Sequence, residues 1–284
     1  MLDLSRTLTA RVGGTAGEVH DPASLDELVA TLDRLRARGR SPRLLGGGSN
    51  IVALEGVLAE PVVRTGALRG TTRLTDTLWQ VEAGAQLGRI VHESARRGLT
   101  GLECCAGVPG TVGAAIRINA GGKWGTIGAV LREVTLLAPN GTRVTRDVSP
   151  ADFVYRKSPF WDDVVLSAKV ELAPAPTTAT ATRPLDRIAE VMRHKKTTQP
   201  LNLPSAGCIF RNPSPERPAG RLIDQAGLKG TRVGGALVSP VHANYFVNVG
   251  GATGRDFLEL IGIVRDRVRD ACGVELELEV EIWS

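Results

Sequence analysis

The chain has 284 residues, of which 42% are hydrophobic and only 4% aromatic, so it is long enough for two or three domains with aliphatic cores. Its formal net charge is +5, and basic residues are scattered except at 193–196, a pattern that argues against nucleic-acid binding and suits an anionic small molecule. No stretch of about 18 apolar residues is present, so no membrane span is expected.

The four cysteines also bear on the class of protein. Cys104, Cys105, Cys208 and Cys272 show neither the paired spacing of a zinc site nor a secreted disulfide pattern. The N-terminus lacks the charged and apolar regions of a signal peptide. We therefore expect no metal and a cytoplasmic location, where thiols stay reduced.

The first part of the chain, residues 1–67, is predicted to be a small α/β unit. Ser24 and Glu27 form a capping box, and the apolar residues after it recur at helical spacing until Gly39. Short strands are predicted at 43–45 and 62–63. The first of them leads into a run of three glycines.

Residues 68–172 are predicted to form a second, α+β unit. Strands are expected at 79–82, 131–137 and 164–172, a helix at 87–97, and a hairpin turn at Asn140–Gly141. Residues 173–184 contain three prolines among alanines and threonines, and they are predicted to be a linker.

The third part, residues 185–284, is predicted to hold helices at about 185–196, 219–226 and 254–271. Thr253 would cap the last of these, with Asp256 in its first turn. Apolar and acidic residues alternate strictly over 274–282, which predicts a half-buried strand with its four glutamates on one face.

Glycine-rich segments occur at 46–48, 106–113 and 119–122. Glycine lets a ligand approach the backbone, and successive N–H groups in such loops can bind phosphate. Ser49 and Asn50 would add side-chain donors. None of the segments fits the dinucleotide or triphosphate fingerprints, so a large phosphate-bearing cofactor held in another way is expected.

Seven motifs occur in an order that resembles the UDP-N-acetylenolpyruvoylglucosamine reductase (MurB) family, and the resemblance covers nearly the whole chain. They are Leu45–Asn50, Gly107–Gly113, Tyr155–Ser158, Pro204–Pro213, Ala219–Gly230, His242–Asn244 and Leu276–Val280. Because no long insertion separates Arg156 from the linker, the chain is similar to the short form that lacks the substrate-loop insertion.

The resemblance implies an α+β protein of three domains. Domains 1–67 and 68–172 would form an FAD-binding module of the PCMH/vanillyl-alcohol-oxidase type. Domain 185–284 would bind substrate, with its last strand able to pack back on that module. The FAD contacts implied are Gly46, Gly47, Gly48, Ser49, Asn50, Gly107, Pro109, Gly110, Thr111, Gly113, Asn119 and Gly121.

The implied reaction is the NADPH-dependent reduction of UDP-N-acetylglucosamine enolpyruvate to UDP-N-acetylmuramate, a step of peptidoglycan precursor synthesis. Arg156 matches the family's catalytic arginine, and its planar guanidinium suits a carboxylate that gains charge. Glu279 matches the catalytic glutamate. Taken without the resemblance, the arginine could lie in a solvated turn and the glutamate on a solvated face.

Cys208 is the main departure from the family, because most members have a proton-donating serine at this position. A thiol, with a pKa of about 8.5, is a stronger acid than an alcohol and can donate the same proton. A small buried hydrophobic role is the alternative.

Substrate contacts implied by the resemblance are Tyr155, Lys196, Arg211, Asn212 and Asn244. Arg211 stands where a lysine is usual, which changes the reach toward a diphosphate. A monomer is expected. Two other functions stay open: an FAD-dependent sugar or hydroxy-acid oxidase of the same scaffold, and a non-catalytic nucleotide-binding homologue.

Overall fold

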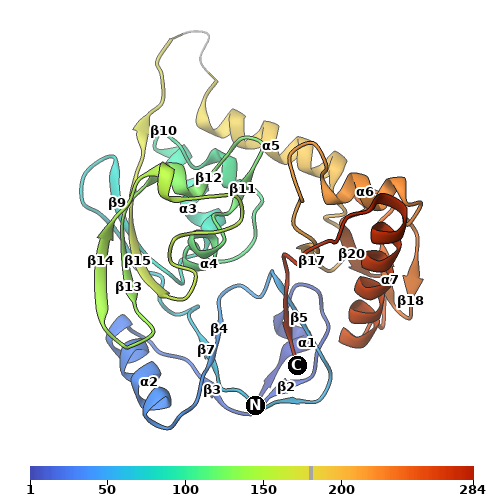
Figure 1. The fold of residues 1–284 in the computed structure, drawn as a ribbon. Coiled ribbons are helices and arrows are strands. Elements are labelled where there is room, and N and C mark those ends of the chain that lie inside the picture. The colour runs from blue at the N-terminus through green and yellow to red at the C-terminus, as the bar shows by residue number, and fades with distance from the viewer. Residues whose placement is uncertain (179–181) are drawn as a thin grey trace. The chain divides into compact units, whose positions relative to one another are not determined.

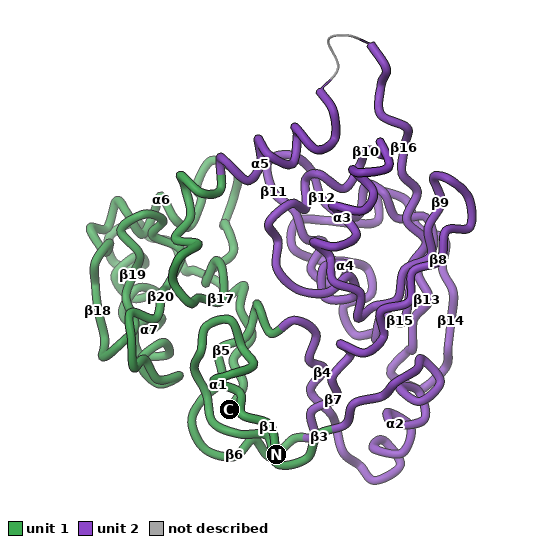
Figure 2. Tube along the Cα trace, turned by 180° about the vertical axis from the view of Figure 1, so that it is seen from behind, with its two compact units in different colours: residues 1–19, 48–60, 195–284 green, residues 20–47, 61–194 purple. Residues whose placement is uncertain are grey.

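The computed structural model describes residues 1–178 and 182–284 (Figure 1), so residues 179–181 of the predicted linker lie outside the described part. The fold divides into two compact units, each built from segments that are distant in the sequence (Figure 2). Unit 1 comprises Met1–Val19, Gly48–Glu60 and Lys195–Ser284, and unit 2 comprises His20–Gly47 and Pro61–His194. The predicted boundaries at 1–67, 68–172 and 185–284 stay a prediction.

A five-stranded antiparallel sheet is the centre of unit 2, in the order β14-β13-β15-β9-β8. Its strands are β8 (Thr71–Arg73), β9 (Leu78–Glu82), β13 (Leu131–Leu137), β14 (Arg143–Asp147) and β15 (Val164–Glu171). Burial alternates along β9, where Trp79 and Val81 are buried and Gln80 is exposed, as expected for a strand with one face in the core.

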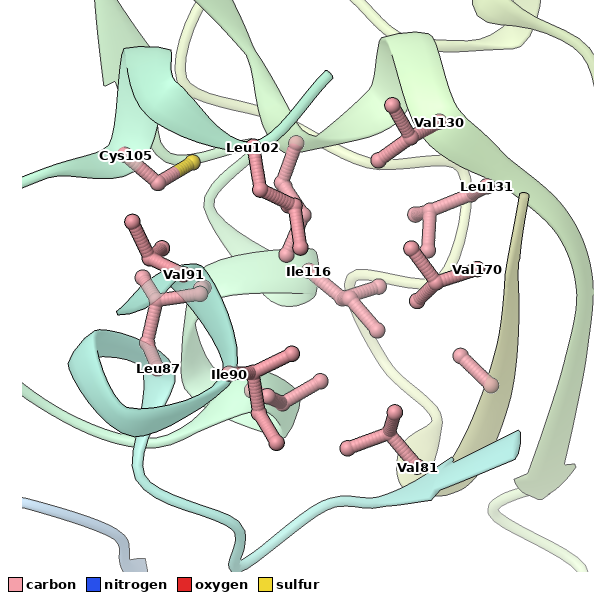
Figure 3. Packing of buried hydrophobic residues seen from close by; sticks show 14 of the residues in the cluster. Val81, Leu87, Ile90, Val91, Leu102, Cys105, Ile116, Val130, Leu131 and Val170 are labelled. Atoms are coloured by element: carbon pink, nitrogen blue, oxygen red, sulfur yellow. The ribbon is translucent and has the colours of Figure 1, made fainter. Parts of the chain in front are cut away.

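Two helices, α3 (Leu87–Arg96) and α4 (Val112–Arg117), contribute apolar side chains to the core of this sheet. Figure 3 shows Leu87, Ile90 and Val91 of α3 near Ile116 of α4 and Val81 of β9. Burial of these aliphatic residues is the main source of stability of the unit, at roughly 25 cal/mol per Å² of apolar surface.

The predicted helix after the capping box is α2 (Leu25–Ala37), which begins where the Ser24 side chain accepts a hydrogen bond from the Glu27 amide. Gly39 follows with φ +65°, as the termination signal predicted. The predicted short strands are β4 (Arg43–Leu45) and β7 (Val62–Arg64), which pair in parallel beside β3 (Val19–His20).

Short elements complete the part of the chain around the glycine segments. They are β10 (Leu99–Thr100), η1 (Glu103–Cys105), β11 (Gly121–Gly122), β12 (Gly125–Thr126), η2 (Ile127–Val130), η3 (Pro150–Asp152), β16 (Ala173–Pro174) and α5 (Pro184–Thr198). The first residues of the predicted linker therefore form a strand, since β16 pairs with β10.

Unit 1 contains a four-stranded antiparallel sheet in the order β17-β20-β19-β18 and two helices that share a core with it. These elements are β17 (Ser205–Cys208), α6 (Ala219–Gln225), β18 (Arg232–Val233), β19 (Ala236–Val238), β20 (Tyr245–Asn248) and α7 (Gly254–Cys272). Thr253 caps helix α7 as predicted; the structure adds that Thr253 and Asp256 form a reciprocal capping box, and the helix ends at Gly273 with φ +63°.

The N-terminal segments of unit 1 are β1 (Leu2–Asp3), α1 (Leu4–Thr7), β2 (Thr15–Ala16), β5 (Ile51–Ala53) and β6 (Val57–Leu58). The last strand, β21 (Glu281–Trp283), pairs in parallel with β5. The predicted strand over 274–282 is therefore wrong in extent. Over 274–280 the structure has only an isolated bridge between Leu278 and Phe210.

Among the described residues, no helix combines the length and hydropathy needed to cross a bilayer.

Candidate active site

The first two glycine segments meet inside unit 2 with their backbones in contact. A Cβ atom on Gly47 would lie 2.5 Å from the Cα of Gly110, and one on Gly46 would lie 2.6 Å from Oγ1 of Thr111. Gly107 and Gly110 have φ values of +68° and +112°, which few other residues adopt. The paired loops thus present backbone free of side chains, a surface suited to close approach by a phosphate-bearing group.

The start of α4 is used differently from a typical anion-binding helix terminus. The amides of Val112 and Gly113 donate to the carbonyls of Ala85 and Ala83, at 2.9 and 2.8 Å. A Cβ on Gly113 would lie 2.7 Å from that of Ala83. Packing therefore accounts for this glycine, and its predicted contact with FAD stays a prediction.

Gly48, Ser49 and Asn50 belong to unit 1, where they precede β5. Gly48 has φ +65° and lies against Thr7 and Leu8. The Asn50 side chain donates to the carbonyl of Glu279 at 3.0 Å, and the Glu281 amide donates to the Asn50 carbonyl at 2.9 Å. The structure thus joins a predicted cofactor residue to a predicted catalytic one.

The third glycine segment lies beside the Tyr155–Arg156 motif in unit 2. Asn119 is buried and has φ +44°; its side chain donates to the Val154 carbonyl at 3.0 Å and accepts from the Gly128 amide at 3.2 Å. Arg156 donates through Nη1 to the Gly121 carbonyl at 3.1 Å.

Backbone strain gathers at this same place. In residues 1–178 and 182–284, the non-glycine residues with positive φ are Arg11, Asn119 and Arg156, and two of these three belong to this cluster. Such conformations cost about 1–3 kcal/mol each and concentrate at functional sites. Tyr155 is 53% exposed, and its ring centroid lies 5.3 Å from Cζ of the Arg156 guanidinium.

Cys208 and Glu279 are brought close in unit 1 through their backbones. Cys208 ends β17 and is half-buried. The next residue, Ile209, accepts a 2.8 Å hydrogen bond from the Glu279 amide, and Phe210 bridges to Leu278. The segments that carry the predicted proton donor and the predicted glutamate therefore run antiparallel to each other.

The two predicted substrate amides make hydrogen bonds within unit 1. Asn244 is 2% exposed; it accepts from the Phe210 amide at 3.0 Å and donates to the Phe210 carbonyl at 2.8 Å. Asn212 accepts from the Ala219 amide at 3.0 Å, at the start of α6. This geometry gives both side chains a structural task, and their contact with substrate stays a prediction.

The predicted cationic contacts differ in exposure. Lys196 is exposed on α5, and Arg211 is half-buried, with its amide donating to the Glu277 carbonyl at 2.8 Å. Arg156 and Tyr155 belong to unit 2, whereas Cys208 and Glu279 belong to unit 1. The convergence of these groups on one substrate stays a prediction.

Sequence reasoning did not single out Tyr245 or His242 as site residues. Tyr245 lies directly opposite Cys208 in the β17–β20 pair, and its ring lies edge-on to that of His242, with centroids 5.0 Å apart. Burial lowers the pKa of His242, and Lys229 adds to this. The signal available in the sequence was position, because His242 begins the His242–Asn244 motif and Tyr245 directly follows it.

Comparisons with known proteins cover both ends of the chain. The FAD binding domain family matches residues 18–147, and the C-terminal domain family of UDP-N-acetylenolpyruvoylglucosamine reductase matches residues 199–283. Among the described residues, no group of three or more His, Cys, Asp or Glu side chains could hold a metal ion.

Relatives of this name match along almost the full length. The UDP-N-acetylenolpyruvoylglucosamine reductase of Moorella thermoacetica is 38% identical over 282 residues, covering 99% of this chain and 91% of that protein. The enzyme of Synechococcus sp. (strain CC9605) is 39% identical over 279 residues, covering 96% of this chain and 91% of that protein.

A solved structure agrees with the sequence matches. The crystal structure of UDP-N-acetylenolpyruvylglucosamine reductase (MurB) from Thermus caldophilus has a TM-score of 0.80 and 36% identity, covering 100% of this chain and 98% of that one. The α+β class, with an FAD-binding module and a MurB C-terminal domain, is confirmed. The chain therefore belongs to the UDP-N-acetylenolpyruvoylglucosamine reductase (MurB) family, the FAD-dependent oxidoreductases that act on a UDP-sugar in peptidoglycan precursor synthesis.

Proposed function

We propose that Arg156, Cys208 and Glu279 carry out the reduction of the enolpyruvyl group, with NADPH as the reductant. The observation that carries this assignment is the antiparallel contact of the Cys208–Phe210 and Leu278–Glu279 segments, which supports a joint role for the thiol and the carboxyl group. When bound, FAD supplies the hydride that reaches C3 of the enolpyruvyl group.

Each residue has a separate task. Arg156, whose guanidinium is oriented by the Gly121 carbonyl, stabilises the charge that spreads from C2 into the substrate carboxylate. Cys208 gives its proton to C2: the S–H bond breaks, a C–H bond forms, and water later restores the thiol. Glu279 helps to stabilise the charged intermediate.

FAD would be held mainly by the paired loops that contain Gly46, Gly47, Gly107 and Gly110, because these loops present backbone free of side chains. Their close contact depends on glycine, since a side chain at Gly47 would push the two backbones apart. The segment Gly48–Asn50 would add polar contacts. Gly113 would support these loops through its packing against Ala83, and Asn119 through its hydrogen bonds to Val154 and Gly128.

The UDP-sugar would be contacted by Tyr155, Lys196 and Arg211, while Asn212 and Asn244 would hold the backbone around Cys208 in place. We further propose that the protein is the short form of the enzyme, a cytoplasmic monomer. Light scattering should then give a mass near 30.1 kDa, and a doubled mass would contradict the monomer.

Cys208→Ala separates the proposed donor role from a packing role. We expect flavin reduction by NADPH to be unchanged and flavin reoxidation by the enolpyruvyl substrate to slow by about 10²–10⁴-fold, the usual loss on removal of a general acid. Rapid mixing at the flavin absorbance band measures the two half-reactions separately.

Cys208→Ser should retain reoxidation within about tenfold, because a hydroxyl can donate the same proton. Cys272→Ser, at a half-buried thiol near the end of α7, is the matched control and should match the parent. If Cys208→Ala reoxidises as fast as the parent, the thiol takes no part in the reaction.

A further inference from the structure

Two thiols outside the proposed reaction lie side by side in unit 2. The turn η1 places Cys104 and Cys105 with their Sγ atoms 3.7 Å apart, close enough to share a hydrogen bond. Cys104 is 8% exposed and Cys105 is fully buried in the core shown in Figure 3. The Sγ atom of Cys104 lies 3.8 Å from the Gly101 carbonyl oxygen, and that of Cys105 lies 3.8 Å from the Ala120 carbonyl oxygen.

The separation of the sulfurs suits a single thiophilic atom. An atom bound about 2.3 Å from each sulfur, the usual zinc–thiolate distance, spans sulfurs roughly 3.3–3.8 Å apart when its bond angle lies between a right angle and the tetrahedral value, the range that includes pyramidal trivalent arsenic. The observed 3.7 Å therefore needs little movement of η1 for both sulfurs to bind one atom.

The number of ligands decides which atom fits. A structural zinc needs four protein ligands, and among the described residues no group of three or more His, Cys, Asp or Glu side chains is arranged to hold a metal ion. The nearby carboxylate of Glu103 accepts from Oγ1 of Thr100 at 2.6 Å and from the Gly101 amide at 2.7 Å. Trivalent arsenic requires only two thiols, because its third substituent comes with the reagent.

The surroundings of Cys104 also favour its thiolate form. The hydrogen bond from Cys105 holds the pKa of the Cys104 thiol below its usual value, against the opposing effects of burial and Glu103. Thiolate is the form that bonds to soft elements.

We propose that Cys104 and Cys105 form a two-thiol binding site for trivalent organic arsenicals. With phenylarsine oxide, both S–H bonds break and two As–S bonds form, while the oxygen leaves as water and arsenic stays trivalent. The site is linked to the second glycine segment, because the Cys105 carbonyl accepts a hydrogen bond from the Val108 amide within that segment. A Cβ on Gly125 of the β11–β12 hairpin would lie 3.8 Å from Sγ of Cys104.

The test uses the folded, FAD-loaded protein and phenylarsine oxide as the probe. We expect one arsenical per chain by intact mass, and loss of two of the four thiols when the adduct is unfolded and titrated with a thiol reagent. A dithiol such as dithiothreitol should remove the adduct, whereas an equal concentration of a monothiol should leave most of it.

Variants locate the site. Cys104→Ser should abolish the adduct, and Cys272→Ser should leave it unchanged. Circular dichroism is used to check that each variant is folded. If Cys105→Ser does not fold, the test depends on Cys104→Ser, which changes the more exposed of the two thiols. Equal adduct in Cys104→Ser and the parent, or labelling of the parent only after unfolding, would overturn the proposal.

Discussion

Asn244 shows how one side chain can hold a candidate site together. The side-chain amide of Asn244, which is 2% exposed, forms hydrogen bonds with both the N–H and the C=O of Phe210, two residues after Cys208. Asn244→Ala would leave a buried N–H and a buried C=O without this partner. Each such group costs about 1–3 kcal/mol, so we expect a loss of about 2–4 kcal/mol in the free energy of unfolding.

Urea unfolding measures that loss. Asn202→Ala, at an exposed position, is the control and should stay within about 0.5 kcal/mol of the parent. If the two variants unfold at the same urea concentration, Asn244 has no structural task and its predicted substrate contact becomes the better account of it.

His242 should make the free energy of unfolding depend on pH. Burial lowers its pKa below the unfolded value of about 6.5, so the folded state binds fewer protons than the unfolded state near that pH. Its contribution to stability is therefore present above about pH 6.5 and is lost as the pH falls. His242→Gln should reduce the fall in the free energy of unfolding between pH 8 and 5.5.

The measurement is urea unfolding at both pH values, with His92→Gln as the control at an exposed histidine. That control should keep the pH dependence of the parent. An unchanged pH dependence in His242→Gln would mean that other groups cause it.

The candidate residues could be predicted from the sequence only through the resemblance. Alternation placed four glutamates on one face and could not choose Glu279 among them. The partners of Asn244 and Asn50 lie 34 and 229 residues away, so no local pattern could have revealed these hydrogen bonds.

At the scale of elements, prediction succeeded where the signals are local. Helix α7 begins at the Thr253 cap that the sequence indicated, because a cap is fixed by neighbours one turn away. The terminal strand was predicted too long. Its backbone bonds go to Ile209 and Asn50, in distant loops, and only Glu281–Trp283 finds a strand partner.

The contact between the first two glycine segments gives a sharp test at this scale. In Gly47→Ala the new Cβ would lie 2.5 Å from the Cα of Gly110, so the two loops must separate. We expect weaker FAD retention, because the proposed cradle opens, together with a lower free energy of unfolding. Flavin fluorescence after ultrafiltration measures the FAD that is released.

Gly88→Ala, on α3, is the matched control, because a Cβ there meets no atom within 4 Å. It should leave FAD retention unchanged and stabilise the protein by up to about 1 kcal/mol, the helix propensity difference between the two residues. Equal FAD retention in the two variants would show that the loop contact is not needed for the flavin.

For the whole molecule, the order of seven motifs was enough to predict the family, because it reflects the entire chain rather than one site. The two units were not predictable in the same way. Residues 1–19 and 48–60 group with 195–284, and one link is the parallel pairing of β5 with β21, some 230 residues apart. Parallel pairing of that kind leaves no local turn signal.

The cofactor should contribute to the stability of the whole molecule. A ligand that binds only the folded state adds RT ln(1 + [L]/Kd), about 2.7 kcal/mol when free FAD is 100 times its Kd. FAD-stripped protein should thus unfold at a lower urea concentration, and each tenfold increase in free FAD above Kd should add about 1.4 kcal/mol to the free energy of unfolding.

Riboflavin is the control: it lacks the phosphates that the glycine segments are proposed to hold, so it should add much less. An unfolding midpoint that does not move with FAD, read by far-ultraviolet circular dichroism, would mean that FAD does not bind selectively to the folded state.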